Sequence, residues 1–112
     1  MPGIDRTTFD ELRQMSGAEF INELIDTFLE DAPKLLAEMK TALAAADADS
    51  FRRAAHSLKS NAATFGAGSL ADLAKELESL GRGNRLTETG ARLEALAEAL
   101  VSACDELRGL KS

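Results

Sequence analysis

His56 is the single histidine of the chain, and its side chain is the one best suited to chemistry near neutral pH. On an ideal helix of about 100° per residue, the nearby apolar residues fall on one face, which holds Phe51, Ala54, Ala55, Leu58, Ala62 and Phe65. His56 points roughly 140° from the centre of that face. Its outward side is shared with two cations and two very small residues, namely Arg52, Lys59, Ser60 and Ala63. A lone histidine is more often packed or incidental, but this pattern predicts an accessible, reactive imidazole.

An accessible imidazole in these surroundings can act as a nucleophile, and a phosphoryl group is one group that such a nucleophile can carry. A neutral imidazole is a good nucleophile near pH 7 because its reference pKa is about 6.5, and the phosphoramidate that it forms can give the phosphoryl group away again. Lys59 lies one helical turn from His56 and can balance negative charge on phosphoryl oxygens. Ser60, Ala63 and Gly66 keep the surface low, which leaves room for a partner to dock.

A second group of charged residues follows about twenty positions later. Lys75, Glu78 and Arg82 share a stripe at i, i+3 and i+7 beside an apolar helix face. If the chain folds back near residue 67, Glu78 lies level with His56, and a carboxylate on one ring nitrogen fixes the tautomer so that the other nitrogen presents its lone pair. The alternative interpretation of these three residues is an ordinary solvated face.

The segment around the histidine resembles the signature of histidine-containing phosphotransfer (HPt) domains of multistep two-component signalling. It reads Ala55-His56-x-Leu58-Lys59-Ser60, followed by small residues and Phe65-Gly66. The resemblance continues over nearly the whole chain, so residues 1–112 are expected to form a single HPt domain. It implies that His56 carries a phosphoryl group on Nε2 and that Lys75, Glu78 and Arg82 surround it. Ser60 departs from the glycine that the family often has there, which puts the range of partners in doubt.

The resemblance also implies the partners. His56 would accept the phosphoryl group from a receiver-domain aspartate or a kinase and pass it to another receiver aspartate. The partners would be response-regulator receiver domains and a hybrid sensor histidine kinase. Mg²⁺ and most of the catalytic apparatus would belong to the receiver, so this chain would be a carrier that binds no cofactor, not a complete enzyme. We expect exposed apolar residues of the first two helices to build the docking surface.

Other classes of protein remain open. The dimerisation domain of a sensor kinase usually has an acid directly after its histidine, where this chain has Ser57. The phosphoryl-accepting domain of a chemotaxis kinase resembles the chain closely, including Thr64-Phe65-Gly66 and the acid at Glu78. A passive helical adaptor would make no use of the histidine. A metal site is least favoured, because one histidine and one cysteine supply few ligands.

Composition limits the partners further. The net charge of −6 argues against nucleic acid or an anionic membrane as the main partner. The stretch around the histidine is locally positive. No acid occurs between Asp49 and Asp72, and Arg52, Arg53 and Lys59 lie there as a positive strip.

Cysteine content and hydropathy address the compartment. Cys104 is the single cysteine, which excludes an intramolecular disulfide, and we expect it to be a small core residue. No apolar run approaches the roughly 20 residues of a membrane span, and the first residues carry no signal-peptide pattern. We therefore expect a cytoplasmic, monomeric protein.

Apolar periodicity predicts an all-α fold, an antiparallel up-down-up-down four-helix bundle with a short extra N-terminal helix across one end. The expected helices are 8–16, 18–46, 50–66, 69–81 and 87–108. The second helix is expected to be kinked at Pro33 and to continue past it, although Asp31 offers an alternative fresh start.

Capping residues set the expected boundaries of these helices. We expect Thr8 with Glu11, either Asp49 or Ser50, and Ser69 at the starts of the first, third and fourth helices. Gly66 is expected just past the end of the third helix, residues 81–84 in a turn, and Gly90 in the weakened first turns of the last helix.

Overall fold

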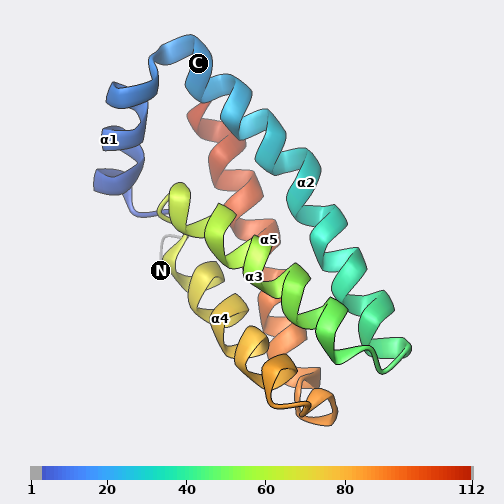
Figure 1. Cartoon of the computed structure of the whole chain (residues 1–112). Helices are drawn as coiled ribbons and strands as arrows, with labels where there is room; N and C mark the ends of the chain where they lie inside the picture. The colour runs from blue at the N-terminus through green and yellow to red at the C-terminus, as the bar shows by residue number, and fades with distance from the viewer. Residues whose placement is uncertain (1–3, 112) are drawn as a thin grey trace.

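The computed structural model describes residues 4–111. These residues form α1 (Arg6–Ser16), α2 (Ala18–Ala44), α3 (Ala48–Thr64), α4 (Gly68–Arg82), the 3₁₀ turn η1 (Leu86–Glu88) and α5 (Gly90–Leu110). Figure 1 shows α2 to α5 side by side as an antiparallel bundle, with α1 set apart at one end. The predicted all-α fold is confirmed, and within residues 4–111 there is no strand.

The core is built from one apolar stripe of each helix, as the periodicity indicates. Among its fully buried members are Phe9, Ile21, Ile25, Phe51, Leu58, Leu70, Leu77, Leu96 and Leu107. Cys104 is also buried, which raises the pKa of its thiol. The apolar periodicity of their helices would turn Phe20 and Val101 inward, but these residues are 51% and 61% exposed. Phe20 is next to the buried Ile21, and Val101 is next to the buried Leu100. Because adjacent residues on a helix point about 100° apart, Phe20 and Val101 lie at the edge of the apolar stripe and face solvent.

The starts of α1 and α3 differ from the predicted caps. Asp5 caps α1 by accepting a hydrogen bond from the Thr7 amide at 3.1 Å, so the helix starts before Thr8. Asp47 caps α3 by accepting from the Ser50 amide at 3.1 Å and from the Ser50 hydroxyl at 2.7 Å. Asp49 was a wrong choice, because its carboxylate lies inside the first turn of α3.

The long helix α2 continues through Pro33 without interruption, so Asp31 does not cap a fresh start. The apolar stripe that persists beyond the proline packs against the core and holds the two parts together. The helix ends at Ala44, two residues before the predicted end at 46, because Ala46 has a left-handed backbone with φ of +55°.

The turn between α3 and α4 is short and tied to the N-terminal segment. Gly66 has φ of +78°, and the Ala67 amide donates to the Ala62 carbonyl at 2.9 Å, which closes the end of α3. The Gly66 carbonyl accepts from the Asp5 amide at 2.7 Å. Ser69, which was expected to be the cap, lies in the first turn of α4, because the helix begins directly after Ala67.

The end of α4 and the start of α5 also move relative to the predicted boundaries. Gly81 and Arg82 belong to α4, and the turn is made by the next residues, where Asn84 has φ of +56°. The 3₁₀ turn delays α5 until Gly90, which is its first residue. The buried Thr89 hydroxyl donates to the Leu86 carbonyl at 2.7 Å and thereby joins this turn to α5.

In the part of the chain that the structure describes, no helix is long and apolar enough to cross a membrane.

Candidate functional site

Glu78 is the centre of a hydrogen-bonded cluster between α3 and α4. Its side chain is only 4% exposed, yet it accepts three hydrogen bonds from charged or titratable groups. His56 Nδ1 donates to Oε2 at 2.8 Å, and Lys59 Nζ donates to Oε1 at 2.7 Å. Arg82 Nη2 also donates to Oε2, at 3.1 Å. The interpretation of this stripe as a solvated face does not describe Glu78, because the carboxylate is buried and paired.

The environment keeps Glu78 ionised. Burial raises the pKa of its carboxyl group, but hydrogen bonds from Lys59 and His56, together with their charges, outweigh burial, and the net pKa is lowered. An ionised carboxylate only accepts hydrogen bonds. His56 Nδ1 must therefore carry the hydrogen in this contact, which leaves the lone pair of the neutral ring on Nε2.

The exposure of His56 suits a group that must meet a partner. Its side chain is 55% exposed although one ring nitrogen is bound to a buried carboxylate. Nε2 lies on the ring edge away from Glu78. The arrangement thus presents an oriented imidazole at the protein surface.

Local structure explains how these residues meet. His56 and Lys59 are one turn apart on α3 and point to the same side, and the tight turn at Gly66 returns α4 antiparallel to α3. Gly81, which the sequence placed in a turn, is buried inside α4. A Cβ atom built on Gly81 would lie 3.2 Å from Arg52 Cα, so glycine lets the two helices approach closely beside Glu78. A glycine in line with the apolar stripe of Leu70, Ala74 and Leu77 is the sequence signal that could have indicated this close approach.

The remaining predicted site residues separate into two groups. Ser60 is exposed and lines, with His56, a hollow of about 440 Å³ between α2 and α3. Ala63 is exposed one turn further along α3. Gly66 lies ten residues from His56, about 15 Å along the helix axis, and its close neighbours are Asp5 and Thr8. Gly66 thus lies against the N-terminal segment and not beside the imidazole.

Arg52 and Lys75, two of the predicted site residues, make no ion pair with Glu78 and direct their charge elsewhere. Arg52 Nη2 pairs with Asp49 Oδ1 at 2.9 Å, and Arg53 pairs with the same carboxylate at 2.8 Å. Lys75 is exposed and lines a hollow shared by α4, η1 and α5. Asp49 therefore offsets one of the two arginine charges in the positive strip expected from sequence, and Lys59, the third cation of the strip, pairs with Glu78.

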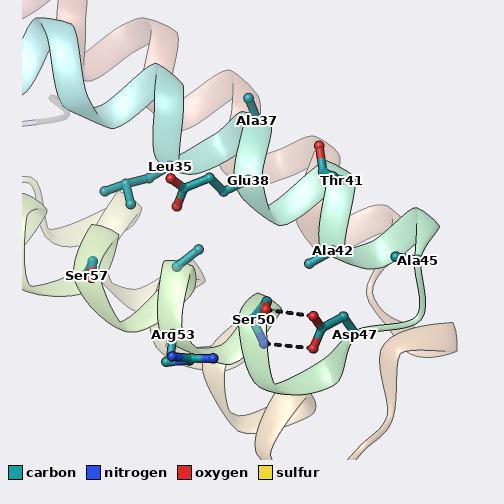
Figure 2. Close-up of a pocket in the computed structure, with 11 residues that line it drawn as sticks. Leu35, Ala37, Glu38, Thr41, Ala42, Ala45, Asp47, Ser50, Arg53 and Ser57 are labelled. Carbon is teal, nitrogen blue, oxygen red and sulfur yellow. Dashed lines mark hydrogen bonds between the residues drawn. The ribbon is translucent and has the colours of Figure 1, made fainter.

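A larger hollow, of about 620 Å³, lies between the second half of α2 and the start of α3. Figure 2 shows residues that line it, including Leu35, Glu38 and Ser57, with the Asp47 cap at one end. These three residues also line the hollow at His56. The two hollows therefore adjoin one another along α2 and α3, and His56 lines the smaller one. Neither hollow was predictable from the sequence, because both depend on the spacing of α2 and α3.

Between residues 4 and 111, no three His, Cys, Asp or Glu side chains lie together as a group that could hold a metal ion. The cluster has one carboxylate, which is occupied by three donors.

A bundle with an exposed, carboxylate-oriented histidine defines a class of phosphotransfer module, and comparison with known proteins agrees. Residues 23–109 match the family model of the Hpt domain, so the chain belongs to the Hpt family of two-component phosphorelay modules. The solved structure of histidine-containing phosphotransfer protein B (HptB) from Pseudomonas aeruginosa PAO1 is similar, with a TM-score of 0.92 and 29% identity. That match covers 98% of this chain and 95% of the other. No curated protein gives a significant match.

Proposed function

We propose that His56 Nε2 accepts a phosphoryl group from the phosphorylated aspartate of one receiver domain and passes it to the aspartate of another. A phosphocarrier role in general follows from membership of the Hpt family. The observation that supports His56 as the carrier is its geometry: a half-exposed imidazole whose Nδ1 is held by a buried carboxylate.

The proposed step is a displacement at phosphorus. The Nε2 lone pair forms the N–P bond while the bond between phosphorus and the aspartyl oxygen breaks, and the electron pair leaves with the receiver carboxylate. The ring keeps its Nδ1 hydrogen and becomes an imidazolium that carries the phosphoryl dianion. Glu78 accepts the Nδ1–H hydrogen bond and stabilises that positive charge. The same cationic ring is a good leaving group for the reverse step.

Lys59 is the group proposed to meet the phosphoryl oxygens. Its side chain is 30% exposed, and it lies one turn from His56 on α3. Because phosphoryl transfer depends mainly on positioning and electrostatic stabilisation, a flexible cation at this place lowers the energy of the transferring group. Ser60 and Ala63 add little bulk beside the ring, so a receiver can approach.

The partners proposed for this module are response-regulator receiver domains and a hybrid sensor histidine kinase. The receiver would supply Mg²⁺ and most of the catalytic groups, and this chain would act as a monomeric carrier in the cytoplasm. That division of roles makes the chain a substrate and carrier of the transfer, not an enzyme on its own.

The test is transfer of labelled phosphoryl groups from a panel of phosphorylated receiver domains to the wild-type protein and to His56→Gln. We expect acid-labile, base-stable label on the wild type alone. Circular dichroism of both proteins controls for folding, and Ser102→Ala, an exposed hydroxyl on α5, is a matched surface control that should retain the label.

Two outcomes would contradict the proposal. Equal label on the wild type and on His56→Gln would show that another residue accepts the group. Absence of label on the wild type with every receiver and with hybrid sensor kinases would favour a passive helical adaptor.

A further inference from the structure

The cluster at Glu78 holds more positive charge than the carboxylate requires. Lys59 and Arg82 both donate to Glu78, so two cations face one carboxylate, while His56 is neutral when it attacks. A phosphorylated imidazolium carries one net negative charge, because the ring is singly positive and the phosphoryl group is a dianion. The excess charge of the cluster thus matches the charge that phosphorylation brings.

The two cations are bound to different oxygen atoms. Lys59 binds Oε1, whereas Arg82 and His56 both bind Oε2. Lys59 shares α3 with His56, one turn away, and can turn from Oε1 to a phosphoryl oxygen. Arg82 shares α4 with Glu78, one turn away, and stays beside the carboxylate. Without Arg82, the departure of Lys59 would leave the buried carboxylate with the phosphorylated imidazolium ring as its one remaining positive partner among the three donors, which weakens the pairing of a buried charge.

Other charged groups near these helices are already paired or face elsewhere. Arg52, the α3 residue closest to Gly81, pairs with Asp49. The hollow on another side of α4 is lined by charged residues of α4, η1 and α5, namely Asp72, Lys75, Glu76, Arg85, Glu88 and Arg92. Within it Arg85 pairs with Glu88, and Arg92 pairs with Glu76. The described cations that contact Glu78 are therefore Lys59 and Arg82.

We propose that Arg82 is a positioning residue, which holds Glu78 ionised while Lys59 turns to the phosphoryl group, so that the Glu78–His56 hydrogen bond persists in the phosphorylated protein. This inference rests on the proposed function. It assigns the two cations separate roles: Lys59 meets the phosphoryl group, and Arg82 acts through Glu78 on the tautomer of His56.

The first test uses the unphosphorylated protein and needs no receiver. Lys59→Gln removes the positive charge of Lys59 from Glu78, as the turning of Lys59 to a phosphoryl group would. We compare it with Arg82→Gln and with the double variant by ¹⁵N NMR of the imidazole, whose signals belong to His56 because it is the single histidine. At a pH of about 8, where a free imidazole is neutral, each single variant should retain the hydrogen on Nδ1.

The double variant should lose most of the Nδ1–H signal. Glu78 would then be buried without a cation and would become protonated. Its carboxylic O–H would donate a hydrogen bond to Nδ1, so Nδ1 would carry no hydrogen and the ring hydrogen would lie on Nε2. Lys59→Gln combined with Arg92→Gln, which removes an exposed arginine paired with Glu76, is the matched control and should behave like Lys59→Gln alone. Retention of the Nδ1–H signal in the double variant, or its equal loss in the control, would overturn the inference.

The second test concerns the phosphorylated state. With phosphoramidate as a small-molecule donor, Arg82→Gln should reach a phosphorylated fraction about two- to fivefold lower than the wild type, the effect expected of an exposed charge pair. An unchanged fraction in Arg82→Gln, with the wild type phosphorylated, would overturn the role of Arg82. If the wild type is not phosphorylated on His56, the proposed function itself is wrong, and the NMR result shows separately whether Arg82 holds Glu78 ionised.

Discussion

Glu78 shows how a single carboxylate can orient a nucleophile. Its side chain is almost fully buried, yet its pKa is lowered, because the donors on Lys59 and His56 outweigh the cost of burial. Glutamine at this position would still accept a hydrogen bond from Nδ1, but it would carry no charge to stabilise the phosphorylated imidazolium. The chemistry thus depends on the charge of Glu78 as well as on its shape.

Glu78→Gln should slow phosphoryl transfer by about five- to tenfold, because a charged hydrogen bond becomes a neutral one. It should also change the dependence of stability on pH. Since the folded pKa of Glu78 is lowered from its ordinary value of 4.5, its contribution to stability is present above about that pH and is lost as pH falls through the folded value.

The stability difference between the wild type and Glu78→Gln should therefore be constant near neutral pH and should narrow as pH falls below about 4.5. Urea unfolding at several pH values measures this difference. Glu76→Gln, which alters an exposed glutamate on the same helix, is the control and should show a much smaller effect. A difference that stays constant as pH falls would mean that the folded protein does not lower the pKa of Glu78.

At the scale of elements, the approach of α3 and α4 determines the site. Gly81 allows this approach, since its missing side chain leaves space for the backbone of Arg52. Gly109 on α5 is different, because a Cβ atom built there would meet no atom within 4 Å. Gly81 and Gly109 therefore provide a matched pair of positions for substitution by alanine.

In Gly81→Ala, crowding against Arg52 should lower the free energy of unfolding by about 1–3 kcal/mol. Alanine favours the helix more than glycine does, which offsets about 0.5–1 kcal/mol of that loss. The substitution should also weaken the Glu78–His56 contact and slow transfer. Gly109→Ala should be neutral or slightly stabilising, with transfer unchanged. Thermal unfolding and transfer rates measure both effects, and equal stability of the two variants would contradict the role of Gly81.

Sequence periodicity was sufficient to predict the bundle and to place His56 on an outward face. Spacing also indicated that Glu78 would lie level with His56. The burial of Glu78 was not predictable in the same way, because it depends on the distance between two helices. The cap of α3 was missed because Asp47, Asp49 and Ser50 are all acceptable caps, and the left-handed residue Ala46 selects the first.

At the scale of the whole molecule, exposed apolar side chains point to where a partner can bind. The largest are Met15 at the end of α1, Phe20 at the start of α2 and Val101 on α5, each more than half exposed. Figure 1 places the end of α1 and the start of α2 together at one end of the bundle. The expectation that the first two helices build a docking surface therefore applies to Met15 and Phe20.

Met15→Ser combined with Phe20→Ser should raise the receiver concentration needed for half-maximal transfer by about tenfold, the loss expected for one or two apolar anchors. The rate at saturating receiver should remain unchanged, because neither residue belongs to the cluster at Glu78. Val101→Ser removes a similarly exposed apolar residue and serves as control. An equal effect of Val101→Ser, or no effect of the double variant, would place the docking surface elsewhere.

The hydrogen bonds that the Glu78 carboxylate accepts within the described residues come from one helical hairpin, α3 with α4. In the proposed transfer, the reacting groups of this chain would thus be encoded in one continuous stretch of sequence. Substitutions in the flanking helices would then change which proteins are recognised while the transfer reaction is kept. Duplicated copies of such a sequence would acquire separate signalling pathways without having to evolve the chemistry again.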